Sequence, residues 1–348
     1  MTYQDQLRSV AFDLARFSAF SAHALLFGLV TIVLLVLRPS FVEASSDEWA
    51  RGRQRVARRL EGIVTTALCA SLIATVVAFL LQVTLISSLE RLPVGSNAFS
   101  EVLQTSFGQW YAARIPVLIA LFVILFGRIR VLAMADADDS PRPQPWWWAT
   151  WAALGFVLLA TTTFSGHAST ASPKVLAVTN DLVHLAAGSI WFAGVIVLAV
   201  ILPDAWVGKP SAERARLLGP AVLRFSHVAL IAISVVAVTG TINSLLQVAH
   251  PGDLLHAAYG LTLLIKIGLF LVILLMGAIN HFYLRGRLRS ANEGEPGRAQ
   301  RLFRRTIAIE LLVALAIMVA SGVLTGQART RQINSTQTEQ TPAQNQSR

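Results

Sequence analysis

Long apolar segments recur along the whole chain and are separated by short polar stretches. Eight such segments stand out, at residues 16–37, 60–87, 110–132, 146–165, 174–202, 221–247, 256–284 and 303–326. Each is close to or above the roughly 20 residues that an α-helix needs to cross the hydrocarbon core of a bilayer. The pattern therefore predicts an all-α fold, a polytopic membrane bundle of about eight transmembrane helices.

The polar stretches between these segments predict the orientation of the chain. Arginine and lysine gather in the first, third, fifth and seventh connections, whereas the even-numbered connections hold almost no basic residues. Short connections that are rich in basic residues remain on the cytoplasmic side of a membrane. We therefore expect both termini to lie outside, which is the periplasm in a Gram-negative cell.

The composition supports a membrane protein and excludes other classes. The chain is 54% hydrophobic and only 14% charged, whereas soluble domains carry about 25% charged residues. The net charge of +10 comes from the loop arginines, so we do not expect nucleic-acid binding. The connections are too short for a soluble catalytic domain, and the chain is not expected to be an enzyme. Its single cysteine, Cys69, excludes an intrachain disulfide framework.

Polar side chains inside one apolar segment indicate a functional site. Asp181 and His184 stand three residues apart, and Trp191 follows seven residues later. On a helix these spacings place all three on one face. Ionisable side chains are costly in lipid and are kept there mainly for function. His167 precedes them in a polar turn on the outer side, and His23 lies in the outer half of the first segment.

These histidines predict a metal site near the outer face. Imidazole is a common ligand for copper, zinc, iron and nickel. We therefore predict His167, His184 and His23 as metal ligands, with Asp181 orienting His184. The chain has no CxxC motif and no cluster of methionines, so a copper site would consist mainly of histidine. An alternative remains open, in which these histidines only form hydrogen bonds between helices.

Lys266 is the second conspicuous intramembrane residue. It lies at a depth similar to that of Asp181 and His184. Because a lone charge at that depth is costly, we predict a buried pair of Lys266 with Asp181. An ammonium group repels a metal cation, so Lys266 is expected to be a structural or coupling charge. Trp191 is expected beside this charge pair.

Two stretches of the chain resemble a known family. They carry Gly166-His167-Ala168, Asp181-x-x-His184, Trp191-x-x-Gly194, Arg224-Phe225-Ser226, Thr239-Gly240, Tyr259-Gly260, Lys266 and Gly277-Ala278-Ile279-Asn280. Over residues 160–326 the chain is similar to the copper resistance D (CopD/PcoD) family. The resemblance implies an inner-membrane protein of copper homeostasis with eight helices. It also implies copper as the ligand and a periplasmic copper-binding partner of the CopC type.

We expect the chain to divide into three parts. Residues 1–145 are expected to form an N-terminal three-helix membrane region, and residues 146–326 a copper resistance D-like five-helix membrane region. Residues 327–348 are rich in glutamine, threonine, asparagine and serine, so we expect a disordered tail. The expected function is copper uptake from periplasm to cytoplasm. A membrane scaffold or assembly factor without a ligand, and a haem-binding electron-transfer protein, remain as alternatives.

Overall fold

The predicted helical bundle is confirmed. The computed structural model describes residues 3–42, 47–90, 96–133, 145–205, 211–248, 250–279 and 296–326. Within these ranges every regular element is helical, and eight helices are long and apolar enough to cross a membrane. Their spanning parts are Val10–Ser40, Gln54–Ser88, Ser106–Phe126, Trp146–Ser165, Lys174–Ile201, Leu218–Gln247, Ala258–Ile279 and Arg304–Leu324.

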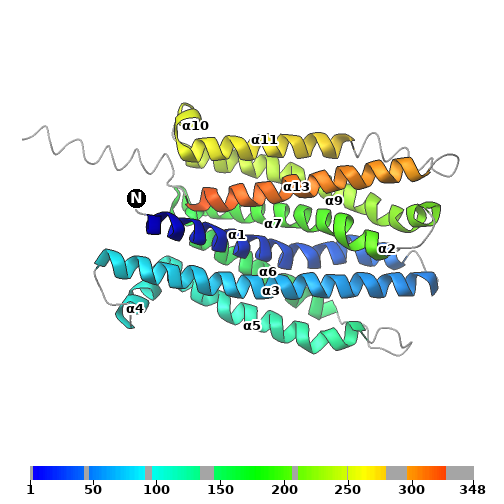
Figure 1. Ribbon diagram of the computed structural model, residues 1–348, viewed down its shortest axis with the longest axis horizontal. Helices are drawn as coiled ribbons and strands as arrows, with labels where there is room; N and C mark the ends of the chain where they lie inside the picture. The colour runs from blue at the N-terminus through cyan, green and yellow to red at the C-terminus, as the bar shows by residue number, and fades with distance from the viewer. Residues whose placement is uncertain are drawn as a thin grey trace, which may run out of the picture.

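The elements follow one another as long helices with a few short helical turns. In chain order they are α1 (Tyr3–Ile32), η1 (Val33–Leu37), α2 (Arg38–Val42), α3 (Asp47–Glu90), α4 (Ser96–Gln104), α5 (Ser106–Ala133), α6 (Pro145–Ser165), η2 (His167–Thr170), α7 (Lys174–Ile196), η3 (Val197–Ile201), α8 (Leu202–Ala205), α9 (Ser211–Gln247), α10 (Asp253–His256), α11 (Ala258–Ile279) and α13 (Pro296–Gly326). Successive spans run in opposite directions (Figure 1). The short elements α4 and α10 lie at the same end of the bundle as the N-terminus.

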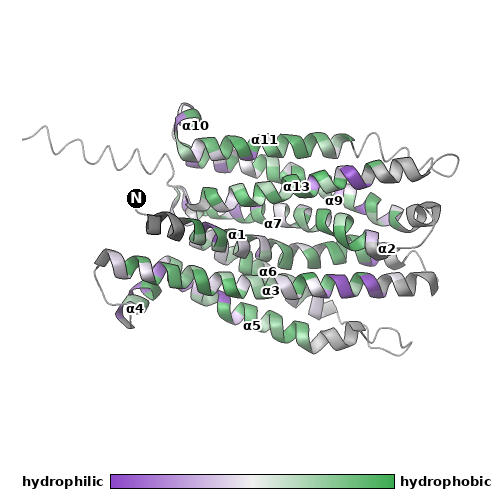
Figure 2. Cartoon of the chain, viewed as in Figure 1, coloured by the Kyte–Doolittle hydropathy of each residue, from purple (hydrophilic) through white to green (hydrophobic). Residues whose placement is uncertain are grey.

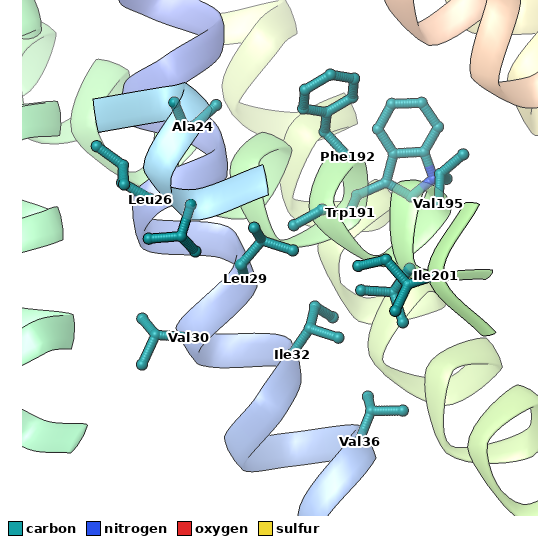
Figure 3. Close-up of a cluster of buried hydrophobic side chains, with 14 of the residues drawn as sticks. Ala24, Leu26, Leu29, Val30, Ile32, Val36, Trp191, Phe192, Val195 and Ile201 are labelled. Atoms are coloured by element: carbon teal, nitrogen blue, oxygen red, sulfur yellow. The ribbon is translucent and has the colours of Figure 1, made fainter. Parts of the chain in front are cut away.

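Helices α1 and α7 form the centre of the bundle. Figure 3 shows Leu29 and Ile32 of α1 facing the part of α7 that carries Phe192, in one cluster of buried apolar side chains. Gly28 allows this close approach, because a Cβ at that position would overlap the backbone carbonyl oxygen of Ser189 on α7. Close packing of this kind, rather than a difference in hydrophobicity, holds helices together in lipid.

Several helices continue beyond the apolar segments that predict them. Pro220 directly precedes the apolar segment 221–247, yet α9 passes through this proline and begins nine residues before it, at Ser211. In the same way, α1 continues through the π-helical turn η1 into α2, which contains Pro39. Proline removes one backbone donor but does not end a helix when its neighbours supply the remaining contacts.

Exposed arginines gather at one end of the bundle. Arg55, Arg58 and Arg59 are exposed near the start of α3, and Arg304 and Arg305 are exposed near the start of α13. Figure 2 shows hydrophilic stretches at this common end of α3 and α13, opposite to the end where the N-terminus lies. The two basic connections thus share a side, as the loop charges predict. That this side is cytoplasmic stays a prediction.

Candidate functional site

His184 lies ten residues after the start of α7 and faces α9. Its Nδ1 atom lies 2.9 Å from the hydroxyl oxygen of Thr239, and that hydroxyl lies 2.6 Å from the carbonyl oxygen of Val235. A hydroxyl has one hydrogen, which here is donated to the carbonyl, so Thr239 must accept the bond from His184 Nδ1–H. The network therefore places the proton of a neutral imidazole on Nδ1. Nε2 is then the unprotonated ring nitrogen, and its lone pair is the one that can accept a proton or a cation.

Gly240 gives the imidazole its space. A Cβ at this position would lie 3.2 Å from Cε1 of His184 and 3.7 Å from its Nδ1. The shorter of these distances is tighter than ordinary van der Waals contact. The sequence pair Thr239-Gly240 thus supplies both the acceptor that orients His184 and the room in which the ring lies.

Asp181 lies one turn before His184 and is joined to α9 by a chain of amides. Asn180 donates from Nδ2 to the carbonyl oxygen of Thr239 and to Oδ1 of Asn243, both over 2.8 Å. Asn243 in turn donates to Oδ1 of Asp181 over a long distance of 3.4 Å. A carboxylate can accept about four hydrogen bonds. Within the described part of the chain, Asp181 therefore retains much of its capacity to bind a cation.

A third helix contributes a hydroxyl to this cluster. Thr163 of α6 is 1% exposed, and its hydroxyl oxygen is buried with no hydrogen-bond partner among the described residues. It lies beside the Asp181 carboxylate without the geometry of a hydrogen bond. Thr163 thus brings a third helix, α6, up to the Asp181 carboxylate.

Lys266 of α11 lies close to both Asp181 and His184. Its charge attracts the Asp181 carboxylate and also acts on His184. In the described ranges, however, its Nζ forms no hydrogen bond and no ion pair within 4.0 Å. We predicted a buried pair of Lys266 with Asp181. In the structure Lys266 attracts the Asp181 carboxylate but does not contact it directly.

His23 belongs to a different polar cluster. It is completely buried. Its Nδ1 lies 2.9 Å from the hydroxyl of Thr162 on α6, and its Nε2 lies 2.9 Å from the hydroxyl of Ser71 on α3. Thr162 also donates to the carbonyl oxygen of Leu158 over 3.2 Å, which makes His23 Nδ1 the donor. Ser71 then donates to Nε2, so both ring nitrogens of His23 are already engaged.

Arg114 is a functional candidate that the sequence reasoning missed. It is 2% exposed and lies in the first third of α5, within the membrane-spanning part Ser106–Phe126. Its Nε and Nη2 atoms donate to the hydroxyl and the carbonyl of Thr161, and Nη2 also donates to the hydroxyl of Ser165. The guanidinium carbon lies 3.8 Å from the ring centroid of Tyr111. A single arginine in an apolar stretch is an intramembrane charge, and this signal was present in the sequence.

The two clusters meet on α6. Three consecutive threonines face different partners: Thr161 bonds to Arg114, Thr162 bonds to His23, and Thr163 lies beside Asp181. Arg114 also acts electrostatically on His23. Both clusters contain a cation, Lys266 in one and Arg114 in the other, but only the cluster of Asp181, His184 and Lys266 also contains a carboxylate that offsets it.

The other predicted site residues lie as follows. Trp191 belongs to the apolar core beside α1, where its indole packs with Phe192 and Val195 (Figure 3). The 3-10 turn η2 begins at His167, whose side chain lies outside the described residues. Among the side chains that the structure describes, no group of three or more His, Cys, Asp or Glu residues could hold a metal ion. The ligand set of His167, His184 and His23 therefore stays a prediction.

The geometry defines a multi-pass membrane protein with ionisable side chains buried between its helices. Family models match both parts of the chain: "Copper resistance protein D-like, N-terminal domain" over residues 6–174 and "Copper resistance protein D" over residues 219–324. The chain belongs to the copper resistance protein D family, and it is a copper-related membrane protein. The division of the bundle at residue 145 stays a prediction.

Two curated proteins are similar to this chain. The copper transport protein CutJ of Bacillus subtilis (strain 168) is 31% identical over 207 residues, which are 59% of this chain but only 35% of that protein. Copper resistance protein D of Pseudomonas syringae pv. tomato is 25% identical over 307 residues, which are 87% of this chain and 92% of that protein. No solved structure matches the chain. The names of the relatives describe copper transport or resistance and not catalysis.

Proposed function

We propose that this chain carries copper across the inner membrane from the periplasm to the cytoplasm. The ion passes a site in the outer half of the bundle that includes His184 and Asp181. The observation that carries this proposal is the hydrogen bond between His184 and Thr239, which leaves Nε2 of the imidazole as a ligand atom. A ligating histidine in a metal site commonly donates its second ring nitrogen to a neighbouring acceptor in this way.

Asp181 supplies the negative charge that a cation needs inside the bilayer. It lies one turn from His184 and has one long hydrogen bond among the described residues. An imidazole and a carboxylate suit copper as well as other transition metals, so the choice of copper comes from the family and not from the ligands. The printed name of CutJ, a copper transport protein, supports transport as the activity.

The entrance is proposed at the end of the bundle that holds η2, α4 and α10, which lies on the periplasmic side. His167, at the start of η2, would receive copper there, and a periplasmic protein of the CopC type would deliver it. From this mouth to His184 the path crosses about ten residues of α7, or roughly 15 Å at 1.5 Å per residue. His23 would not act as a ligand unless its bonds to Thr162 and Ser71 were broken.

Copper accumulation in a host without its own copper importers tests the proposal. Wild type, His184→Ala and His167→Ala are compared at matched amounts of folded protein in the membrane. His227→Ala serves as the control, because His227 is exposed on α9, away from the proposed entrance. We expect His184→Ala to abolish the copper gain, and His227→Ala to retain it. Equal accumulation by wild type and His184→Ala would rule out this site.

The same variants separate the alternative functions. If the chain is a scaffold without a ligand, His184→Ala lowers the amount of folded protein but leaves copper per folded molecule unchanged. If the chain binds haem, the purified protein shows a Soret band that disappears when an axial histidine is replaced. The proposed transport function predicts no Soret band, and stabilisation of the purified wild type by copper that is lost in His184→Ala.

A further inference from the structure

Lys266 lies where a positive charge should hinder a metal site. We propose that its ammonium group is a tethered cation that balances Asp181 before copper arrives, and that the incoming ion takes over this role while the ammonium withdraws. This inference rests on the proposed function of the Asp181 and His184 site. It assigns Lys266 the task of weakening copper binding so that the ion can leave.

The packing of α11 directs Lys266 inward. Tyr259 and Leu263 are buried, and Lys266 follows them at spacings of seven and three residues on the same helix face. The hydroxyl of Tyr259 bonds to the side-chain oxygen of Gln247 on α9, which fixes α11 beside the helix that carries Thr239. Lys266 is half-buried and is the one charged residue in α11.

Lys266 attracts the Asp181 carboxylate from a distance and does not occupy its oxygen atoms. Lys266 attracts the carboxylate without an ion pair within 4.0 Å in the described chain. The carboxylate has its long bond from Asn243, and the buried hydroxyl of Thr163 beside it has no partner. A purely structural ion pair in lipid would be expected to close to contact, because burial makes an unmet charge costly. The open arrangement fits a place that a second cation enters.

The charges cannot all remain in place when a metal ion binds. A copper ion between Asp181 and His184 would leave two positive groups beside one carboxylate, in surroundings of low dielectric constant where like charges repel strongly. Lys266 can relieve this repulsion because its ammonium ends a flexible four-carbon stem. Its return towards Asp181 then favours release of the ion. Lys266 thus acts as a positioning residue and not as a ligand.

Copper binding and copper flux, measured together, test this role. The full-length protein is purified in lipid nanodiscs and titrated with Cu(I) against a chromophoric chelator, and in parallel with Cu(II). The same preparations are placed in proteoliposomes for uptake. For Lys266→Met we expect about tenfold tighter binding, the order expected when one nearby charge is removed, together with a lower KM and a several-fold lower maximal rate. Lys266→Arg should bind like wild type, and Lys174→Met, at the exposed start of α7, should change neither quantity.

The possible outcomes are distinct. If wild type binds copper but Lys266→Met binds it equally or more weakly, the tethered-cation role is wrong while the proposed function stands. If Lys266→Met binds copper more tightly but its maximal uptake rate is unchanged or faster, the tethered-cation role is also wrong. Lys266 would then only repel the ion, without helping its release. If wild type binds and transports no copper in either oxidation state, the proposed function itself fails. Should Lys266→Met not fold, Lys266→Gln in the same two assays takes its place.

Discussion

The Nδ1 atom of His184 lies 2.9 Å from the hydroxyl of Thr239, and this contact joins α7 to α9 at the candidate site. The hydroxyl already donates to the carbonyl oxygen of Val235. The imidazole is therefore held in one tautomer by a side chain on the neighbouring helix. The proposed copper site depends on this orientation.

Replacing Thr239 with valine should weaken copper binding without removing a ligand. Valine keeps the shape but offers no acceptor, so the Nδ1–H of His184 loses its partner and the ring loses its orientation. Loss of such a supporting group costs about 10–100-fold in metal affinity. Thr239→Ser, which retains the hydroxyl, should restore binding. Titration of the purified variants with copper gives the measurement.

Thr241→Val is the matched control for that experiment. Thr241 is exposed on the same helix, and its hydroxyl bonds to the carbonyl oxygen of Ala237 within α9. Its replacement should leave copper affinity unchanged. If Thr239→Val bound copper as tightly as wild type, the proposed orientation of His184 would have no functional role.

A methyl group on Gly28 should destabilise the bundle. The Cβ of Gly28→Ala would overlap the carbonyl oxygen of Ser189, so α1 and α7 must separate. Forcing extra atoms into a packed interior costs about 1–3 kcal/mol. Gly62→Ala on α3 has open space around the new Cβ, and alanine is a better helix former than glycine by about 1 kcal/mol. Thermal unfolding in detergent should therefore show a lower midpoint for Gly28→Ala and an equal or higher one for Gly62→Ala.

Arg114 should not tolerate replacement by lysine. Its planar guanidinium donates to Thr161 and Ser165 from two nitrogens while it lies over the Tyr111 ring. An ammonium group cannot reproduce this fork. Arg114→Lys and Arg114→Ala should both lower thermal stability, by about 1–3 kcal/mol for the polar partners left buried without bonds. Arg58→Lys, at an exposed position on α3, should be as stable as wild type. If Arg114→Lys were also as stable as wild type, the positive charge alone, and not the guanidinium geometry, would matter at this position.

The orientation can be measured with cysteine labelling. In a Cys69→Ser background, single cysteines replace Lys174 at the start of α7 and Arg58 near the start of α3. A membrane-impermeant maleimide added to intact spheroplasts should label the cysteine at 174 and spare the one at 58, because the positive-inside rule assigns them to opposite sides. The reverse pattern would invert the direction of the proposed path. Labelling after membrane disruption provides the control for accessibility.

Hydropathy was sufficient to predict the number and alternation of the spans. The cost of exposing backbone polar groups to lipid leaves few options other than helices, so each apolar segment had to become one. The ends of the helices were less predictable, since α9 continues through Pro220 and α1 continues through a π-helical turn into Pro39. These extensions depend on contacts with neighbouring helices, which apolar length does not encode.

The candidate site was predictable in depth but not in its grouping. Counting residues from the outer end placed Asp181, His184 and Lys266 at one level, and in the structure Lys266 acts electrostatically on the other two. That these residues form a metal site stays a prediction. Depth alone also placed His23 near them, yet His23 faces Ser71 and Thr162. Which face a helix turns towards which neighbour depends on the packing of small residues, and a single sequence does not give this information. Thr163, which lies beside Asp181, belongs to no motif that would have singled it out.

The close contact between α1 and α7 at Gly28 has a consequence for the synthesis of the protein. A ribosome must deliver four spans before the counterpart of the first one exists, because α7, the fifth span, begins only at Lys174. Until then the surface of α1 that carries Gly28 and Leu29 is turned to lipid or to insertion factors. Nascent fragments that end before residue 174 thus lack the helix that packs against Gly28, and this uncovered surface of α1 distinguishes them from the folded chain.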